Sequence, residues 1–197
     1  MLDYDSEAAR YDETRGGHPR AAAAGRALRR LLPDGDRVVL DVGGGTGIVA
    51  EALTSSQRCV LVCDTSHGML RRAVGRLPGR AVRAEATKLP VLDGSVDAVT
   101  TVWLLHLLDA VGVEATVCEA ARVLRPGGRY LTTVDKSASH ARPSSYAATD
   151  GRTDVTAMAS LAGLRYVGEE TFVGHGQRSG AGGSEEPVYT LLAFERR

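Results

Sequence analysis

Two aspartates and a run of glycines are the residues of this chain whose types and spacing could do chemistry. Residues 38–47 read VVLDVGGGTG, in which Asp41 begins the pattern DxGxGxG, and Asp64 ends a second apolar run, CVLVCD. Glycines after a buried strand let the backbone approach a small polar ligand, and an acid at the end of the next strand can hold the two hydroxyls of a ribose. The pattern therefore predicts a nucleoside site.

The spacing of the glycines narrows the choice of nucleoside. Enzymes that bind dinucleotides carry GxGxxG at this turn, and this chain does not have that spacing. The pattern favours S-adenosylmethionine (SAM) over NAD. Each feature also has a purely structural interpretation, because glycines form ordinary tight turns and an acid such as Asp64 is favoured at the start of a helix.

Helical and strand patterns alternate along the chain, which is typical of an α/β fold. Amphipathic segments with apolar residues at helical spacing lie between short apolar runs. The expected strands cover residues 38–42, 59–63, 81–84, 96–102, 130–134, 164–173 and 187–194.

Composition excludes several classes of function. The 197 residues suit one domain, and 24 basic residues balance 24 acidic ones, so we expect neither nucleic acid nor a membrane surface as a partner. No apolar run approaches the ~20 residues of a membrane span, and the acidic start MLDYDSEAARYDE does not resemble a signal peptide. Three cysteines without a CxxC pair predict buried free thiols, a cytoplasmic location and no metal site.

Four sequence blocks in a fixed order carry a resemblance to a known family. The blocks VLDVGGGTG, VCDTSHGML, AEATKLPVLDGSVDAVTTVWLLHLL and RVLRPGGRYLTTV resemble the class I SAM-dependent methyltransferases, in the broad group of the ubiquinone/menaquinone methyltransferases (the methyltransferase type 11 group). The resemblance implies an α/β fold with a Rossmann-like, seven-stranded, mostly parallel sheet, helices on both faces and an antiparallel last strand. It also implies SAM as cofactor and S-adenosylhomocysteine as product.

The same resemblance sets the expected domain organisation, which is a single methyltransferase domain over residues 1–197. A flexible N-terminal flap is expected at 1–18, where relatives fold a Tyr and an Arg over the cofactor. Residues 136–153 are expected to form a short connector in place of a lid. Residues 175–186 are expected to form a mobile, glycine-rich loop.

Cofactor contacts are implied at positions spread through the chain. In this family Asp41 would order the glycine loop and the ammonium end of SAM, and Asp64 would hold the ribose. Glu85 stands where the family has Asp, and Gly44 stands where it often has Cys or Ala. The implied cofactor residues are Tyr11, Arg15, Asp41, Gly43, Gly44, Gly45, Asp64, Thr65, Met69, Glu85, Ala86, Val102 and Trp103.

Several of these positions have a second interpretation of equal weight. Met69 and Trp103 are also suited to ordinary core packing, and Glu85 to an exposed surface. Tyr11 and Arg15 would equally suit a solvated amphipathic helix. An aromatic face such as that of Trp103 would attract the sulfonium electrostatically.

Methyl transfer from SAM is an in-line displacement, so the enzyme mainly holds donor and acceptor in line. A base is needed only if the acceptor must lose a proton. The candidates for that base are His106, His140 and His18, although a lone histidine in the apolar run LLHLL favours a structural role for His106.

The expected connector leaves little room for a lid, which predicts an open site for a small or medium organic acceptor, such as a glycoside, polyketide or modified peptide of natural-product metabolism. The chain would be a monomer or homodimer, and a partner subunit could complete the site. The alternatives are a non-methylating protein of the same fold, such as a cyclase or binding protein, and an NAD-dependent oxidoreductase. Neutral charge and the absence of an Asn-Pro-Pro-Tyr-like segment disfavour RNA and protein acceptors.

Overall fold

The computed structural model describes residues 3–136, 149–174 and 186–197. Helices and strands alternate along the chain, as the hydrophobic periodicity predicts. The helices are α1 (Tyr4–Glu7), α2 (Tyr11–Thr14), α3 (Gly17–Leu31), α4 (Ile48–Leu53), α5 (His67–Arg76), α6 (Ala110–Val123), α7 (Arg152–Leu161) and the 3-10 turn η1 (Leu105–Leu107). The strands are β1 (Val38–Val42), β2 (Cys59–Asp64), β3 (Ala81–Arg83), β4 (Val96–Thr101), β5 (Leu124–Val134), β6 (Leu164–Val173) and β7 (Val188–Arg196).

The strands form one seven-stranded sheet in the order β3-β2-β1-β4-β5-β7-β6. Every neighbouring pair from β3 to β5 is parallel, whereas β7 lies antiparallel between β5 and β6. The predicted fold class is therefore confirmed, including the antiparallel last strand. The boundary that differs most is the start of β5, which lies at Leu124 rather than at residue 130, because Leu124 already pairs with Val96 ahead of an irregularity in the ladder. The other strand ends differ by two residues or fewer.

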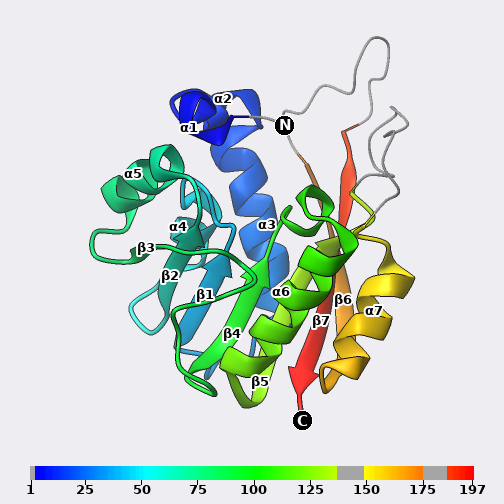
Figure 1. The fold of residues 1–197 in the computed structure, drawn as a ribbon. Helices are drawn as coiled ribbons and strands as arrows, with labels where there is room; N and C mark the ends of the chain where they lie inside the picture. Colours follow the sequence, from blue (N-terminus) through cyan, green and yellow to red (C-terminus); the bar gives the residue numbers. More distant parts are fainter. Residues whose placement is uncertain (1–2, 137–148, 175–185) are drawn as a thin grey trace.

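Helices cover both faces of the sheet (Figure 1). Buried side chains of α3, α4 and α5 form one hydrophobic cluster with the sheet, and those of α6 and α7 form a second cluster on the opposite face. A sheet covered on both faces explains why β1 and β2 have near-continuous apolar sequences rather than alternating ones. The carboxyl ends of β1, β2 and β4 meet at one edge of this sheet, where the predicted site residues lie.

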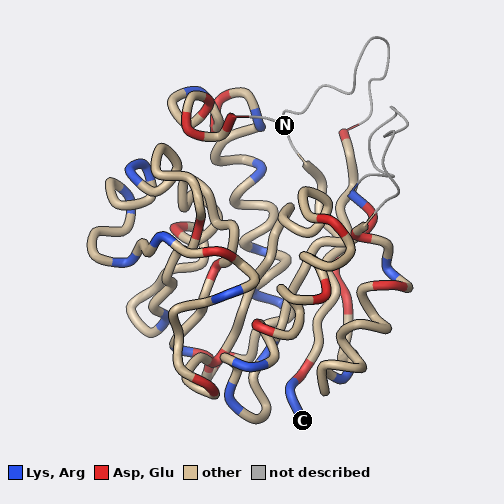
Figure 2. Tube along the Cα trace, viewed as in Figure 1, with Lys and Arg blue, Asp and Glu red and all other residues tan. Residues whose placement is uncertain are grey.

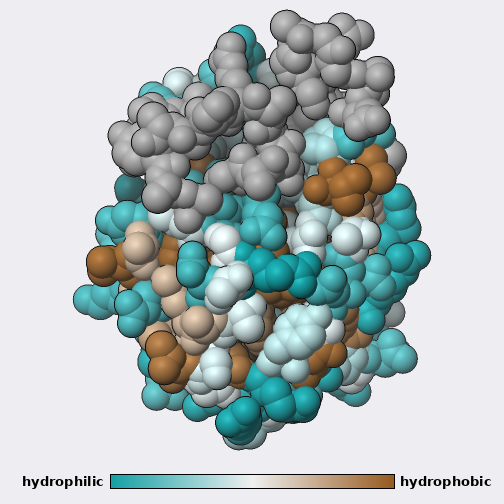
Figure 3. Space-filling model, turned by 90° about the vertical axis from the view of Figure 1, so that its right-hand side faces the viewer, coloured by the Kyte–Doolittle hydropathy of each residue, from teal (hydrophilic) through white to brown (hydrophobic). Residues whose placement is uncertain are grey.

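The surface carries its charges in mixed order. Figure 2 shows acidic and basic positions interspersed along the whole described trace. Figure 3 shows one face on which apolar residues stand in small groups among hydrophilic ones, in the part drawn in colour. None of the helices in the described ranges has the length and apolar character that crossing a bilayer requires.

The cysteines correct one expectation. All three are free thiols, but only Cys63 is buried, while Cys59 is half-buried and Cys118 is exposed on α6. The apolar residues around Cys118 lie on the inner side of α6, and Cys118 itself lies on the outer side. Across the described ranges, no group of His, Cys, Asp and Glu side chains is arranged to hold a metal.

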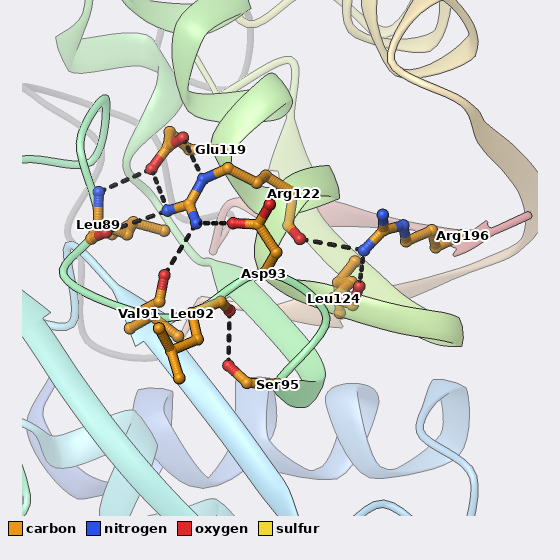
Figure 4. Close-up of polar contacts among 9 residues, drawn as sticks. All are labelled: Leu89, Val91, Leu92, Asp93, Ser95, Glu119, Arg122, Leu124 and Arg196. Carbon is orange, nitrogen blue, oxygen red and sulfur yellow. Dashed lines mark hydrogen bonds and ion pairs between the residues drawn. The ribbon is translucent and has the colours of Figure 1, made fainter.

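A polar clamp fixes the segment that joins β3 to β4 (Figure 4). The guanidinium of Arg122, on α6, donates to the carbonyls of Leu89 at 3.0 Å and Val91 at 2.9 Å. Glu119 binds Arg122 at 2.7 Å and also accepts from the backbone N–H of Leu89 at 2.8 Å. These charge-assisted bonds hold a segment that would otherwise leave its backbone groups without partners. The same segment contains Glu85, four residues before Leu89.

We expect Arg122→Ala to lower the free energy of unfolding by about 2 kcal/mol, because it removes charge-assisted bonds and leaves backbone carbonyls unpaired. Urea denaturation followed by circular dichroism measures the change. The matched control is Arg26→Ala, an exposed position on α3, which we expect to change stability by less than about 0.5 kcal/mol. Equal effects from the two substitutions would show that the clamp contributes nothing.

Candidate functional site

The glycine turn after β1 is held by the end of β2. The N–H of Gly43 donates to the carbonyl of Cys63 at 2.7 Å, and the N–H of Gly45 donates to Oδ2 of Asp64 at 2.9 Å. The other oxygen of Asp64 accepts from the N–H of Ser66 at 2.9 Å, at the start of α5. Burial raises the pKa of Asp64, although these backbone N–H groups act in the opposite direction. One carboxylate thus fixes both the loop and the helix beside it.

Two positions of the turn leave no room for a side chain. Gly43 has φ +69°, and a Cβ there would lie 2.7 Å from the side chain of Leu104. A Cβ at Gly44 would lie 2.6 Å from Oδ2 of Asp41. A side chain at Gly44 would require the Asp41 carboxylate to shift.

Asp41 is a buried acid with one oxygen unsatisfied. Its Oδ1 accepts from the hydroxyl of Thr100 at 2.6 Å, while its Oδ2 has no hydrogen-bond partner among the described residues. Burial, with a smaller contribution from the charge of Asp64, raises the pKa of Asp41 to about 7. A buried polar atom without a partner costs free energy, so it is best explained by a ligand that supplies one. The ammonium group of an amino acid moiety fits this need.

The N-terminal segment is folded onto α5 rather than extended. Oδ1 of Asp5 accepts from the hydroxyl of Ser66 at 2.6 Å and from the N–H of Gly68 at 2.7 Å. Arg72 donates to the carbonyl of Ala8 at 3.1 Å. Asp5 therefore adds a second acceptor to the N-terminus of α5, where backbone N–H groups lack partners within the helix.

A second set of contacts ties the N-terminal segment to the glycine turn. Asp12, in α2, forms an ion pair with Arg76 at 2.6 Å and accepts from the hydroxyl of Thr46 at 2.6 Å. Arg76 also donates to the carbonyl of Thr46 at 2.8 Å. Tyr11 and Arg15, in and next to α2, are on the wall of the cavity described below.

One cavity of about 490 Å³ lies at this edge of the sheet. A cavity of this size accommodates one drug-sized ligand. Its wall contains all the residues that the resemblance implied for the cofactor, together with residues it did not, among them Tyr4, Arg20 and Thr46. The structure thus brings the predicted positions together, and their binding roles remain predictions. The predicted residues on the wall are Tyr11, Arg15, Asp41, Gly43, Gly44, Gly45, Asp64, Thr65, Met69, Glu85, Ala86, Val102 and Trp103.

The side chain of Met69 is buried, as core packing predicts, and it also lines the cavity, so its role at the adenine ring stays a prediction. Glu85 and Thr65 are exposed residues of the cavity wall. A carboxylate at Glu85 therefore remains hydrated, which lowers the cost of placing it beside a polar ring edge.

Trp103 has an unusual backbone and an unexpected partner. Trp103 follows β4 and has φ +58°, a left-handed backbone conformation that is rare outside glycine. Its backbone N–H donates to the hydroxyl of Thr133 at 2.7 Å. The guanidinium carbon of Arg20 lies 3.5 Å from the centre of the indole ring. Phe172 and Tyr189 pack edge-on against the same ring at 5.7 and 5.5 Å. An arginine, which the sequence did not suggest, therefore occupies one face of Trp103.

The candidate bases are not brought to the cavity. His106, in η1, lies with Nε2 2.7 Å from Nζ of Lys136, and neither residue is part of the cavity wall. His18 is exposed on α3 and is also outside that wall. His140 lies outside the described residues. The expectation of a histidine base at the site is therefore not supported for His106 or His18.

Sequence reasoning missed Arg20, although the sequence holds a signal for it. Arg20, Ala24 and Leu28 follow one another at a spacing of four in α3, and all three are buried. A charged residue in register with the apolar face of a helix indicates a buried charge with a specific task. Sequence reasoning also missed Lys136. Its position two residues after the end of β5 is a weaker indication of a functional residue.

The fold is an α/β fold of Rossmann type, with a cavity at the carboxyl ends of its central strands. Residues 40–132 match the family described as a methyltransferase domain. Relatives include the ubiquinone/menaquinone biosynthesis C-methyltransferase UbiE of Rubrivivax gelatinosus, 36% identical over 54% of this chain and 42% of its own length. A demethylmenaquinone methyltransferase of Beutenbergia cavernae is 39% identical over 65% of this chain and 54% of its own length. The chain thus spans about half the length of these relatives.

Solved structures share the fold over nearly the whole chain. A SAM-dependent methyltransferase of Thermotoga maritima has a TM-score of 0.73 with 20% identity, and covers 98% of both chains. The complex of the Trm112 methyltransferase activator with a methyltransferase from Haloferax volcanii has a TM-score of 0.76 with 19% identity, covering 100% of this chain and 99% of that chain. The [4+2]-cyclase SpnF has a TM-score of 0.74 with 18% identity, covering 98% of this chain and 93% of its own.

The chain is similar to the SAM-dependent methyltransferases over residues 40–132, and SAM is the cofactor that this similarity implies. The residues present fit that cofactor. The unpaired oxygen of Asp41 suits its ammonium group, the glycine turn excludes Cβ atoms, and the Asp64 carboxylate lies on the cavity wall.

We expect Asp41→Asn to raise stability and weaken ligand binding. The folded protein holds the pKa of Asp41 at about 7 against an ordinary 3.8, so the charged form destabilises it as pH rises between these values. The variant should therefore gain stability over the wild type across that range, on the order of a few kcal/mol, as measured by denaturation at several pH values.

The same variant should bind S-adenosylhomocysteine about tenfold or more weakly by calorimetry, because a neutral amide replaces the anion facing the ammonium group. For the wild type, affinity should fall as pH drops below about 7, since protonation of Asp41 removes the charge. Affinity independent of both pH and the substitution would exclude Asp41 from the ligand site.

Proposed function

We propose that this chain transfers a methyl group from SAM to a small or medium organic acceptor. The observation that carries the proposal is a cavity whose wall contains the glycine turn, Asp41 with its unpaired buried oxygen, and Asp64. A cytoplasmic location is part of the proposal and is supported by three cysteines that form no disulfide.

The chain's own residues would mainly bind and align the reactants. Asp41 would receive the ammonium group of the cofactor, and Asp64 its ribose hydroxyls. The N-terminal segment, held by Asp12 and Asp5, would exclude water from the reacting atoms. SAM supplies the activated methyl group, so alignment can account for most of the rate.

The acceptor would come from natural-product chemistry, such as a glycoside, a polyketide or a modified peptide. Support comes from the short segment between β5 and α7, which leaves little chain for a separate lid domain. The demethylmenaquinone methyltransferases named among the relatives make a quinone-like acceptor a further member of the test panel.

The experiments below also test two alternative functions, a non-methylating protein of the same fold and an NAD-dependent oxidoreductase. The likeness to the cyclase SpnF shows that this fold is shared by a protein named for another reaction, so the fold does not decide the chemistry. An NAD-dependent oxidoreductase is disfavoured by the DxGxGxG spacing.

We expect S-adenosylhomocysteine, and not NAD, to raise the melting temperature, because the ligand binds the folded state only. At a concentration one hundred times the Kd, the stabilisation should be about 2.7 kcal/mol. Differential scanning fluorimetry with both ligands makes the comparison. Stabilisation by NAD alone would refute the proposal.

Turnover is tested separately. Incubation with SAM and a panel of acceptors, followed by detection of S-adenosylhomocysteine, should show release that depends on one acceptor class. Asp64→Ala should reduce that release at least about tenfold through loss of cofactor binding. Binding of SAM without release for any acceptor would favour the non-methylating alternative.

A further inference from the structure

Two basic side chains meet at the carboxyl end of β5. Nζ of Lys136, two residues after that strand, lies 2.7 Å from Nε2 of His106 in η1. A lysine ammonium can only donate hydrogen bonds, and the same holds for both ring nitrogens of a charged histidine. The contact therefore forms only when at least one of the two groups has given up a proton.

The surroundings of Lys136 favour its neutral form. Burial is the largest cause, and together with the charges of Arg20 and Arg15 it lowers the pKa of Lys136 to about 7. Asp150 acts in the opposite direction, and its Oδ2 accepts from the backbone N–H of Lys136 at 2.8 Å. An amine whose pKa lies near neutral pH can accept a proton and release it again within one turnover.

The backbone that presents Lys136 is strained and firmly held. Asp135, directly before it, has φ +54°. The N–H of Asp135 donates to the carbonyl of Asp150 at 2.8 Å, and its Oδ1 accepts from the N–H of Arg152 at 3.0 Å. Among the described residues other than glycine, only Asp135 and Trp103 have a left-handed φ, and they follow the neighbouring strands β5 and β4. Strain of this kind persists where the surrounding structure enforces it, and it clusters at functional sites.

The pair lies next to the cavity that the cofactor would occupy. The strands follow the order β2-β1-β4-β5 in the sheet. Asp64 ends β2 and Trp103 follows β4, and both are on the cavity wall. Lys136 follows β5, one strand further along, and Leu107, the neighbour of His106 in the chain, is again on the wall. A cofactor that spans β2 to β4 therefore leaves the end of β5 for the acceptor.

We propose that Lys136, oriented by His106, takes the proton from a hydroxyl of the acceptor, so that the reaction is an O-methylation. This inference rests on the proposed function. The acceptor oxygen forms a bond to the methyl carbon, the carbon–sulfur bond breaks with its electron pair passing to sulfur, and the hydroxyl proton moves to Nζ. His106 keeps Nζ in place by accepting one of its hydrogens at Nε2, which leaves the lone pair of the amine for the acceptor.

The first test reads the proton on Lys136 directly. The chain has two lysines, Lys88 and Lys136, so protein labelled with carbon-13 lysine gives two Cε signals, which Lys88→Arg assigns. We expect the Lys136 signal to titrate near pH 7, and His106→Phe to move its midpoint to lower pH, because the charged amine then loses an acceptor. A Lys136 signal that stays charged above about pH 9 would overturn the proposal.

The second test supplies an acidic hydroxyl. Protein saturated with S-adenosylhomocysteine is titrated with para-nitrophenol, whose phenolate absorbs visible light, and with para-nitroanisole, which has no proton to give. We expect bound para-nitrophenol to ionise at a lower pH than free para-nitrophenol, because its proton passes to Lys136 and the phenolate then lies beside an ammonium.

The matched variants for this titration are the two lysines. Lys136→Met should abolish the shift in ionisation and leave the binding of para-nitroanisole within about twofold, whereas Lys88→Met, at an exposed position, should keep the shift. Identical ionisation of bound and free para-nitrophenol would overturn the proposal, and so would a lack of saturable binding.

Turnover supplies a measurement that a purely structural role would not change. At saturating SAM, with an acceptor that supports release of S-adenosylhomocysteine, kcat should fall as pH drops below about 7, since protonated Lys136 cannot accept a proton. Lys136→Met should lower kcat at least about hundredfold and leave the KM for SAM within about twofold. Lys136→Arg should not restore the rate, because arginine stays protonated. Full activity of Lys136→Arg would show that only the charge matters and would overturn the proposal.

The outcomes separate this inference from the proposed function. Unimpaired release of S-adenosylhomocysteine by Lys136→Met would leave methyl transfer standing and refute the role of Lys136. If S-adenosylhomocysteine does not bind the wild type, methyl transfer is refuted, and the para-nitrophenol titration of the unloaded protein tests the base by itself. If Lys136→Met does not fold, the lysine spectra and the para-nitrophenol titration of the wild type decide the question.

Discussion

The carboxylate of Asp64 is the contact on which the rest of the site depends. One of its oxygens holds the glycine turn through Gly45, and the other holds the start of α5 through Ser66. The hydroxyl of Ser66 in turn donates to Asp5, which anchors the N-terminal segment. A single acid thus links the turn that approaches the ligand to the segment that covers it. Asp64 is the last residue of β2 and pairs with Arg83 of β3, directly after Cys63, which pairs with Val42 of β1.

The burial of Asp41 lowers the stability of the ligand-free protein. The fold buries this acid with one oxygen unpaired, which destabilises the ligand-free protein and, under the proposed function, leaves that oxygen available to a cationic group. Gly44 is part of the same arrangement, because any side chain there would displace the carboxylate. The strained backbone of Trp103 is a second instance, held in place by its bond to Thr133. The unfavourable free energies of charge burial and backbone strain are therefore concentrated where ligands are expected to bind.

Most of the fold followed from the sequence, because each strand is a short apolar run between clear turns. The bounds of β1 and β6 agree with the pattern, whereas β5 was placed too late because a Pro-Gly-Gly segment looks like a loop. The predicted positions that line the cavity followed from local motifs. Arg20 was missed because its partners, Trp103 and Tyr189, are far away in the chain. Contacts of this kind depend on tertiary packing, which no short pattern encodes.

The distribution of charge in the cavity has a consequence for the order of events, given the proposed function. A sulfonium donor is attracted to an anionic acceptor across the low-dielectric interior, which favours assembly of both reactants. Transfer of the methyl group removes the charge on sulfur, and with it that attraction. An anionic acceptor would then be bound more weakly beside the product than beside the donor. The same charges that gather the reactants would therefore help to release the products once the methyl group has moved.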